Sequence, residues 1–370
     1  MRIIFSAGGT GGHVNPAIAM AEKIRERYPE AEILFVGREG GRENRTVTDS
    51  GFKIKTLKVS GISKSLSLST LRSVILAARA TREAKGIIRE FSPDVIVGTG
   101  GYVCWPMLRA GQGLGIPTVI HESNALAGRT TRLLARHCSL VMVNYEETAR
   151  QLDKRSKVIA VGNPLRSGFG RMRRETARRS LGLGSGDILI VSFGGSIGAE
   201  KINSVCAELM RRYSSREGRI RHIHASGERH YDNFPSDFKR ERNGCVALPY
   251  IDDMARVLAA ADIAITRAGA LTLSELACVG AAAILIPSPN VKDNHQYENA
   301  RLVADSGGAV LIEEGNLTYD SLLPAIRRLC EKSEERLLMQ RKIRRFYKSG
   351  ASEACAEAII NQASFKGCGR

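Results

Sequence analysis

Two glycine-rich turns, each directly after an apolar run, are the parts of this sequence best suited to chemistry. They span Phe5–His13 (FSAGGTGGH) and Val191–Ala199 (VSFGGSIGA). Glycine after a strand lets the backbone approach a ligand closely, and the helix that follows presents backbone N–H groups to an anion. One such turn alone is more often a tight turn than a site, but two in matching places favour binding of a phosphate or diphosphate.

Neither turn matches the common nucleotide-binding loops. Val14 stands where the pattern G-x-G-x-x-G needs its third glycine, and the second turn contains no G-x-G. The sequence also lacks the pattern G-x-x-x-x-G-K-[ST]. Binding of a dinucleotide cofactor and a P-loop are therefore disfavoured.

A third turn of small residues, Thr266–Glu275 (TRAGALTLSE), also opens an expected helix. In one interpretation Thr272 caps this helix and forms a T-x-x-E capping box with Glu275, without any function. In the other, a diphosphate binds at the helix N-terminus and Glu275 accepts hydrogen bonds from ribose hydroxyls. The spacing favours neither interpretation.

Histidines provide one candidate catalytic group. His13 lies where the first glycine turn enters a helix, so it is either a polar capping partner or a general base suited to neutral pH. His222 and His224 share one face of an expected strand, but acidic and cysteine ligands are lacking nearby, which disfavours a metal site. His121-Glu122 lacks the second histidine of H-E-x-x-H, and no D-x-D is present to hold a metal diphosphate. We therefore expect no metal and no cofactor.

The elements that position these turns follow one plan used twice. Short β-branched runs alternate with helical patterns such as Pro16–Arg27, and the alternation restarts after Arg166. This order predicts βαβ units in two doubly wound parallel sheets, that is, two Rossmann-like domains with an interdomain cleft. A proline restricts the residue before it, so the hinge is expected near Gly162-Asn163-Pro164, with domains 1–163 and 164–350. The expected strands are Ile3–Ser6, Ile33–Val36, Val95–Val97, Thr118–His121, Leu140–Val143, Val158–Val161, Ile188–Phe193, Ile220–Ala225, Ile263–Thr266 and Ala283–Ile286.

Composition bounds the class of protein. The 370 residues are 43% hydrophobic, 25% charged and 5% aromatic, which is ordinary for a globular chain and excludes a disordered one. The net charge of +17 favours an anionic partner. The eight cysteines form no C-x-x-C pair and are expected in the core of a protein from a reducing cytosol. We find neither a signal peptide nor a run of about 20 apolar residues, so any membrane contact is expected to be peripheral.

One expected helix carries an unusual stripe. Its apolar part and its basic part fall on a single helical face between residues 71 and 89. The face either packs on the core and turns basic at its solvent end, or enters a lipid surface and meets anionic headgroups. Nucleic-acid binding is disfavoured because stacking aromatics and a known module are lacking. The stripe consists of Leu71, Val74, Ile75 and Ala78, followed by Arg82, Lys85 and Arg89.

Seven short motifs in one order make a family resemblance specific. In that order the chain, from about Arg2 to its last helix, resembles the peptidoglycan N-acetylglucosaminyltransferases of glycosyltransferase family 28. The motifs are Gly8-Gly9-Thr10-Gly11-Gly12-His13, Gly100-Gly101-Tyr102-Val103, His121-Glu122 with Asn124, Gly162-Asn163-Pro164 with Arg166, Gly194-Gly195-Ser196, Ile251-Asp252-Asp253-Met254 and Gly269-Ala270-Leu271-Thr272 with Glu275.

The resemblance implies a GT-B fold, with the acceptor in the N-terminal domain, UDP-GlcNAc mainly in the C-terminal domain, and the last helix (about 353–365) packed back on the N-terminal domain. It implies transfer of N-acetylglucosamine (GlcNAc) to the C4 hydroxyl of the muramyl sugar of lipid I, with inversion, to give lipid II. The enzyme would then lie on the cytoplasmic side of an anionic bacterial membrane. Other cell-wall synthesis and division proteins are further candidate partners.

The same resemblance implies roles for single residues. His13 would be the general base, next to Thr10, Gly11 and Gly12. The residues implied to bind UDP-GlcNAc are Asn124, Arg166, Ser196, Ile251, Ala270, Leu271, Thr272, Leu273, Ser274, Glu275 and Gln296. The chain departs from the family pattern at four places. Ser123, Ile197 and Ala268 stand where the family commonly has Gln, Gln and Ser. Cys104-Trp105 replaces a smaller pair, and it either alters the acceptor loop or supplies a membrane-facing aromatic.

Rival functions remain open on the sequence alone. One is another UDP-sugar enzyme on the same fold, either a lipid glycosyltransferase with a different acceptor or a UDP-GlcNAc 2-epimerase. Another is a non-catalytic scaffold that binds a UDP-sugar. A nucleic-acid-binding protein is the third, and it would bind DNA or RNA with a steep salt dependence.

Overall fold

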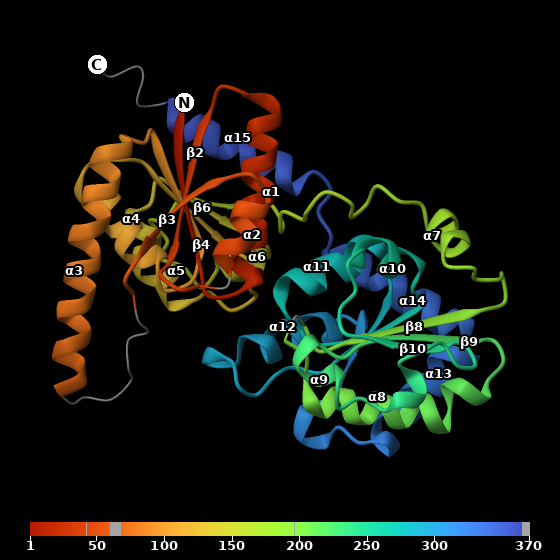
Figure 1. The fold of residues 1–370 in the computed structure, drawn as a ribbon. Coiled ribbons are helices and arrows are strands. Elements are labelled where there is room, and N and C mark those ends of the chain that lie inside the picture. Colours follow the sequence, from red (N-terminus) through yellow and green to blue (C-terminus); the bar gives the residue numbers. More distant parts are fainter. Residues whose placement is uncertain (42, 60–67, 196, 365–370) are drawn as a thin grey trace. The chain divides into compact units, whose positions relative to one another are not determined.

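The computed structural model describes residues 1–41, 43–59, 68–195 and 197–364, with side chains except at 43 and 68–75 (Figure 1). The chain forms two compact units. The N-terminal unit contains residues 1–166 and 348–370, and the C-terminal unit contains residues 167–347. Each unit is described below by itself.

The N-terminal unit is built on a parallel sheet of seven strands in the order β3-β2-β1-β4-β5-β6-β7. Its strands are β1 (Arg2–Ala7), β2 (Glu32–Arg38), β3 (Lys53–Leu57), β4 (Val95–Gly100), β5 (Thr118–Glu122), β6 (Leu140–Val143) and β7 (Val158–Ala160). Its helices are α1 (Gly11–Arg27), α2 (Glu43–Asp49), α3 (Leu68–Phe91), α4 (Cys104–Gly113), α5 (Arg129–Leu134), α6 (Glu146–Ala149) and α15 (Ala351–Ser364), with a short 3-10 turn at Ala135–His137.

Alternate side chains of the central strand β1 serve the two faces of this sheet. Ile3 and Phe5 pack with helices α1 and α15, whereas Ile4 packs with helices α3 and α4 on the other face. Cys355 and Ile359, four residues apart on α15, are fully buried in the first of these layers. The C-terminal helix is therefore part of the N-terminal core.

The C-terminal unit repeats the plan with six parallel strands in the order β10-β9-β8-β11-β12-β13. Its strands are β8 (Ile188–Phe193), β9 (Ile220–Ala225), β10 (Cys245–Leu248), β11 (Ile263–Thr266), β12 (Ala282–Leu285) and β13 (Ala309–Leu311). Its helices are α7 (Arg174–Ser180), α8 (Glu200–Arg212), α9 (Glu228–Tyr231), α10 (Met254–Ala260), α11 (Ala270–Val279), α12 (His295–Asp305), α13 (Tyr319–Glu331) and α14 (Ser333–Ile343). Short 3-10 turns lie at Ser214–Arg216, Ser236–Phe238, Lys292–Asn294, Glu314–Asn316 and Arg344–Phe346.

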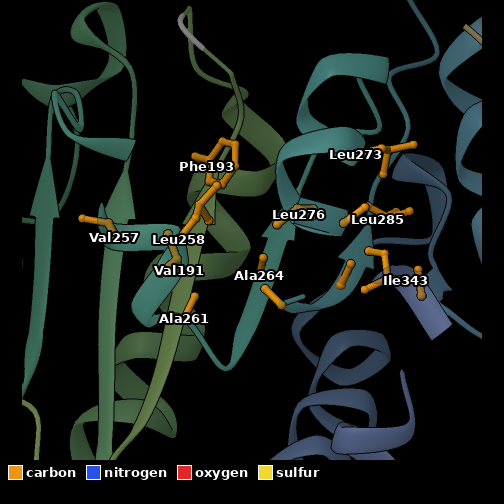
Figure 2. Packing of buried hydrophobic residues seen from close by; sticks show 14 of the residues in the cluster. Val191, Phe193, Val257, Leu258, Ala261, Ala264, Leu273, Leu276, Leu285 and Ile343 are labelled. Atoms are coloured by element: carbon orange, nitrogen blue, oxygen red, sulfur yellow. The ribbon is translucent and has the colours of Figure 1, made fainter. Parts of the chain in front are cut away.

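One face of this second sheet is covered by α10, α11 and α14. Figure 2 shows Val191 and Phe193 of β8 packed with Leu258 of α10, and Leu273 and Leu276 of α11 near Leu285 of β12. Burial of the apolar residues of α11 fixes this helix against the sheet. The helix N-terminus therefore lies at the carboxyl ends of strands β11 and β12.

The prediction of two Rossmann-like parallel sheets is confirmed. Helix α1 begins at Gly11, in line with the expectation that the first glycine turn enters a helix near His13, and it continues through Pro16. The sequence analysis missed three strands, β3, β10 and β13, which all lie at sheet edges. The chain crosses between the units after Arg166 and after Tyr347.

Candidate functional site

The glycine turns after β1 and β4 pack directly on each other. The Gly8 N–H donates to the Gly100 carbonyl oxygen over 3.3 Å. Gly101 has φ +88°, and a Cβ atom there would lie 2.0 Å from the Gly8 oxygen. Only glycine fits such a contact. Two motifs that are about 90 residues apart in the sequence therefore form one surface at the carboxyl edge of the sheet.

His13 lies on this surface, half-buried in the first turn of α1. Its Nδ1 lies 3.1 Å from the Thr99 carbonyl oxygen, and the Thr99 hydroxyl donates to the His13 carbonyl oxygen over 2.7 Å. A carbonyl only accepts hydrogen bonds, so Nδ1 carries the hydrogen and the neutral ring has its lone pair on Nε2. The imidazole is thus held in the tautomer that a general base needs.

The three residues before His13 form the start of helix α1. Thr10 is the N-cap, makes no side-chain capping bond and is exposed together with Gly11 and Gly12. The first turn contains no acidic residue. The partial positive charge of the helix N-terminus is therefore not offset by a carboxylate in that turn.

Asn124 is positioned by a buried carboxylate that the sequence analysis did not single out for a role. Glu122, 6% exposed, accepts from the Asn124 backbone N–H over 3.1 Å and from Asn124 Nδ2 over 3.0 Å through one oxygen. Its other oxygen accepts from the Gly128 N–H over 2.9 Å and from the Thr131 hydroxyl over 2.7 Å. Four donors around one carboxylate fold the loop between β5 and α5.

The same loop is also held from helix α6 and beyond. The Thr148 hydroxyl lies 3.0 Å from the Asn124 carbonyl oxygen, and Gln151 Nε2 donates to the Ala125 oxygen over 2.8 Å. His121 Nε2 donates to the Gly162 oxygen over 2.9 Å, and burial lowers the pKa of His121. His121 is therefore a neutral structural residue next to the crossing between the units.

In the C-terminal unit the turn before α11 corrects one interpretation of the sequence. The N-cap of α11 is Gly269, which makes no side-chain capping bond, and the helix begins at Ala270. Thr272 is a first-turn residue and not the N-cap, so the T-x-x-E capping box is wrong. The anion-binding interpretation of this terminus does not depend on such a box.

Helix α11 presents its residues to different surroundings. Thr272 and Glu275 are half-buried, while Ala270 and Leu271 are buried at the terminus. Leu273 is 1% exposed and its N–H donates to the Gly269 oxygen over 3.0 Å. The Ser274 hydroxyl donates to the Ala270 oxygen over 3.1 Å. The Leu273 side chain therefore packs in the core, and the Ser274 hydroxyl is bonded to the helix backbone.

Two residues missed by the sequence analysis hold the turn before α11. Asn299 of α12 is fully buried and its Nδ2 donates to the Ala268 oxygen over 3.2 Å. Arg267 donates to the Ile286 and Pro287 oxygens, over 3.3 Å each, and forms an ion pair with Glu314. No spacing in the sequence indicates these contacts, because they join loops that meet only when β11 and β12 pair.

The remaining residues expected to bind UDP-GlcNAc lie in helix α12 and in loops of both units. Gln296 Oε1 accepts from the Ser288 N–H over 2.9 Å, which leaves its amide nitrogen as the donor it can offer to a ligand. Ile251 is 3% exposed and precedes α10, whose N-cap is Asp253. Arg166 is exposed and belongs to the N-terminal unit. Ser196 lies outside the described residues.

The face of α3 that carries the stripe points away from the core. Ala78, Arg82 and Arg89 are exposed and Lys85 is half-buried, while the buried side chains Ala80, Ala84, Ile87 and Ile88 lie on the opposite face. The side chains of Leu71, Val74 and Ile75 lie outside the described part of the chain. Figure 1 shows α3 at the outer edge of its unit. Both interpretations of the stripe place its basic half in solvent, so the exposed basic residues do not decide between them; among its apolar residues only Ala78 has a described side chain, and it is exposed.

Trp105 does not support the membrane expectation placed on it. Its side chain is half-buried and packs against the hydrophobic cluster under α3 and α4. Within the described residues, no helix is both long enough and apolar enough to cross a bilayer.

Metal and thiol chemistry are not indicated among the residues that the structure describes. No group of three or more His, Cys, Asp or Glu side chains there could hold a metal ion. Seven cysteines are buried free thiols, and Cys368 lies outside the described residues. Burial raises the pKa of Cys104 and of Cys138 to about 11. The cysteines behave as small core side chains.

Comparisons with known proteins give a consistent result. The model of the "Glycosyltransferase family 28 N-terminal domain" matches residues 3–143, and that of the "Glycosyltransferase family 28 C-terminal domain" matches residues 189–354.

Two curated relatives, from Acetivibrio thermocellus and Thermoanaerobacter sp., are 42% and 40% identical to the chain. Each alignment covers 97% of this chain, and 97% and 99% of the respective relative. Both are named UDP-N-acetylglucosamine--N-acetylmuramyl-(pentapeptide) pyrophosphoryl-undecaprenol N-acetylglucosamine transferase. The crystal structure of Acinetobacter baumannii MurG is similar, with a TM-score of 0.77 and 27% identity over 97% of this chain and 99% of that one.

Proposed function

The chain belongs to glycosyltransferase family 28, and from this premise we propose that it transfers GlcNAc from UDP-GlcNAc to the C4 hydroxyl of the muramyl sugar of lipid I. The reaction inverts the anomeric centre and yields lipid II for peptidoglycan synthesis. The observation that carries this proposal is the 42% identity, over 97% of both chains, to a curated transferase with that name.

An inverting displacement requires a general base that takes the proton from the acceptor hydroxyl. One displacement forms the bond between the acceptor oxygen and C1 of GlcNAc, breaks the bond from C1 to the diphosphate, and releases a proton from the C4 hydroxyl. His13 Nε2 is the atom we assign to that proton, because the bond from Nδ1 to the Thr99 oxygen fixes the tautomer.

The departing UDP needs stabilisation of its growing negative charge. The N-terminus of α11 offers backbone N–H groups and the helix dipole, with Ala270, Leu271 and Thr272 in its first turn. Glu275, one turn further along the same helix, is assigned to the ribose hydroxyls. Gln296 and Asn124 are assigned to the sugar, Ile251 to the uracil, and Arg166 and Ser196 to the nucleotide and its phosphates.

We place the enzyme peripherally on an anionic membrane surface, since its acceptor is a lipid. The outward basic face of α3, with Arg82, Lys85 and Arg89, is suited to anionic headgroups. Leu71, Val74 and Ile75 continue the same helical spacing toward the start of the helix. They are assigned to the apolar part of this contact.

The deciding experiment measures transfer of labelled GlcNAc from UDP-GlcNAc to a lipid I analogue, with EDTA present and with a control lacking acceptor. Acceptor-dependent product supports the proposal. Formation of an epimerised UDP-sugar without acceptor would indicate an epimerase instead, and binding of UDP-GlcNAc without any turnover would indicate a scaffold.

Single variants separate the two half-sites. His13→Ala should abolish turnover while UDP-GlcNAc affinity is retained, because the base contacts only the acceptor hydroxyl. Glu275→Ala should weaken UDP-GlcNAc binding about tenfold through loss of the ribose acceptor. Unchanged donor affinity in Glu275→Ala would contradict its assignment to the ribose.

The membrane assignment has its own test. Changing Arg82, Lys85 and Arg89 together to Glu should weaken binding to anionic vesicles but spare turnover on a short-chain acceptor. The matched control changes three exposed arginines of the C-terminal unit, Arg211, Arg216 and Arg240, to Glu, which alters the net charge equally. Equal loss of vesicle binding in both triple variants would show that only the net charge matters, and it would contradict a specific role of the α3 face.

A further inference from the structure

Five buried side chains next to the second glycine turn are joined by four hydrogen bonds. The Ser192 hydroxyl lies 2.7 Å from His222 Nε2 and 2.7 Å from His224 Nδ1. From there the chain extends to the Ser214 hydroxyl, 3.1 Å from His222 Nδ1, and to Asn203 Oδ1, 3.2 Å from His224 Nε2. The relay, as we call it, consists of Ser214, His222, Ser192, His224 and Asn203, and the most exposed of them, Asn203, is 6% exposed.

The direction of every bond in the relay follows from its last acceptor. Asn203 Nδ2 donates to the Ser226 carbonyl oxygen over 2.8 Å, so Asn203 Oδ1 accepts from His224 Nε2. His224 Nδ1 must then accept from the Ser192 hydroxyl, whose oxygen accepts from His222 Nε2. His222 Nδ1 in turn accepts from the Ser214 hydroxyl. Burial lowers the pKa of both histidines to about 3, so both rings stay neutral and keep this direction.

The relay has residues on both sides of the second glycine turn in the sequence, and its last acceptor contacts Gly198. Ser192 lies in β8 just before the turn, and Asn203 lies in α8 just after it. Ser226, the last acceptor, begins the turn on which Gly198 rests: a Cβ atom at Gly198 would lie 2.1 Å from the Ser226 oxygen. A Cβ atom at Gly227 would lie 2.6 Å from the Gly198 nitrogen. The backbone around Gly198 therefore cannot shift toward Ser226 and Gly227.

We propose that the relay positions the backbone of Gly194, Gly195 and Gly198 to bind the diphosphate of the nucleotide donor, with Ser192 and Asn203 as its positioning residues. The inference rests on the proposed function, because it takes this turn as part of the UDP-GlcNAc site. Backbone N–H groups bind an anion well only when their direction is fixed in advance. Fully satisfied buried hydrogen bonds provide such rigidity.

The test compares the Michaelis constants for donor and acceptor in the full-length enzyme. Ser192→Ala interrupts the relay, leaving His222 Nε2 without an acceptor and His224 Nδ1 without a donor. Asn203→Leu releases the Ser226 carbonyl, and Asn203→Ser is the milder variant if Asn203→Leu does not fold. We expect the KM for UDP-GlcNAc and the Kd for UDP to rise about five- to tenfold, with the acceptor KM unchanged.

Two controls separate positioning from stability. Val205→Ala, on the same helix α8 and 6% exposed, removes buried carbon without touching the relay. It should lower the Tm but leave the donor KM unchanged. Ser192→Thr keeps the hydroxyl and should restore a donor KM close to that of the parent enzyme.

The outcomes distinguish this inference from the proposed function. If Ser192→Ala and Asn203→Ser lower the Tm as Val205→Ala does and leave the donor KM and UDP affinity unchanged, the relay only stabilises the fold and the inference is overturned. If the parent enzyme does not bind UDP-GlcNAc, the proposed function fails first. A donor-specific rise that Ser192→Thr reverses supports the relay as a positioning device.

Discussion

Replacing Glu122 with glutamine keeps the size of the side chain but removes its charge and turns one acceptor atom into a donor. In the parent protein both carboxylate oxygens accept two hydrogen bonds each. The glutamine can keep Oε1 toward Asn124 and place Nε2 toward Gly128 and Thr131. The Thr131 hydroxyl can rotate and accept from Nε2, but the Gly128 N–H cannot.

The loss can be added up bond by bond. One buried backbone N–H without a partner costs about 1–3 kcal/mol. The bonds that remain change from charge-assisted to neutral, and each such change weakens a bond by roughly 1 kcal/mol before compensation. Closure of the loop at residues 123–131 should therefore weaken by about 3 kcal/mol, because the parent carboxylate is only 6% exposed and water cannot replace these bonds.

Hydrogen exchange followed by mass spectrometry measures this quantity locally. A loss of about 3 kcal/mol speeds exchange of the loop amides on the order of a hundredfold when reclosing is fast. Glu146→Gln, an exposed acid of the same unit, is the matched control and should change nothing. An increase below threefold at residues 123–131 in Glu122→Gln would refute the assignment of Glu122 as the centre of this loop.

Two further predictions concern the two units separately. Gly101→Ala places a Cβ atom 2.0 Å from the Gly8 oxygen and should abolish turnover without weakening UDP binding. Gly115→Ala is the control, because Gly115 also has positive φ but open space around it, and it should lower the free energy of unfolding by only about 1 kcal/mol. Equal losses of activity in the two variants would contradict the close contact at Gly101. The pKa values of His222 and His224 fall from 6.5 to about 3 on folding, so the unfolded chain binds more protons and stability is lost as pH falls from 6.5 toward 3. Urea unfolding should show a loss of about 2 kcal/mol per histidine between pH 7 and pH 5, and a flat profile would exclude their neutral burial.

All strands with neighbours on both sides were predicted from the sequence, whereas of the four edge strands only β7 was. Ile188–Phe193 and Ile220–Ala225 were predicted at their observed limits. The first is a nearly continuous apolar run, as is typical of a buried parallel strand, and the second mixes apolar residues with arginine and histidine over its first five positions. The strand β3 (Lys53–Leu57) alternates lysine with apolar residues and is half-exposed, so its run is too short and too polar to stand out. β10 and β13 are edge strands of four and three residues, and only pairing with a longer neighbour makes them strands.

Residues of the candidate site could be predicted where they are neighbours in the sequence. They could not be predicted where their contacts depend on how strands and loops pair. The glycine turns and His13 follow from spacing alone. The hydrogen bonds from Asn124 to Glu122 could not be predicted from spacing. Two of the four donors to this carboxylate belong to Gly128 and Thr131, beyond a turn that the sequence does not define. Thr272 was misjudged because threonine is a good N-cap, yet the helix begins two residues earlier, at Ala270.

The buried relay shows why the identity of one side chain depends on strand register. The sequence places His222 and His224 on one face of a strand, but only the pairing of β8 with β9, which sets Ser192 opposite His224, brings a hydroxyl between the two rings. A neutral hydroxyl can accept from one imidazole and donate to the other at the same time. A carboxylate at residue 192 could only accept and a lysine could only donate, so either would oblige one ring to change tautomer or charge. The direction of the relay, and with it the hydrogen bond from Asn203 to the Ser226 carbonyl, therefore requires at this position a side chain that accepts and donates at the same time, as the serine hydroxyl does.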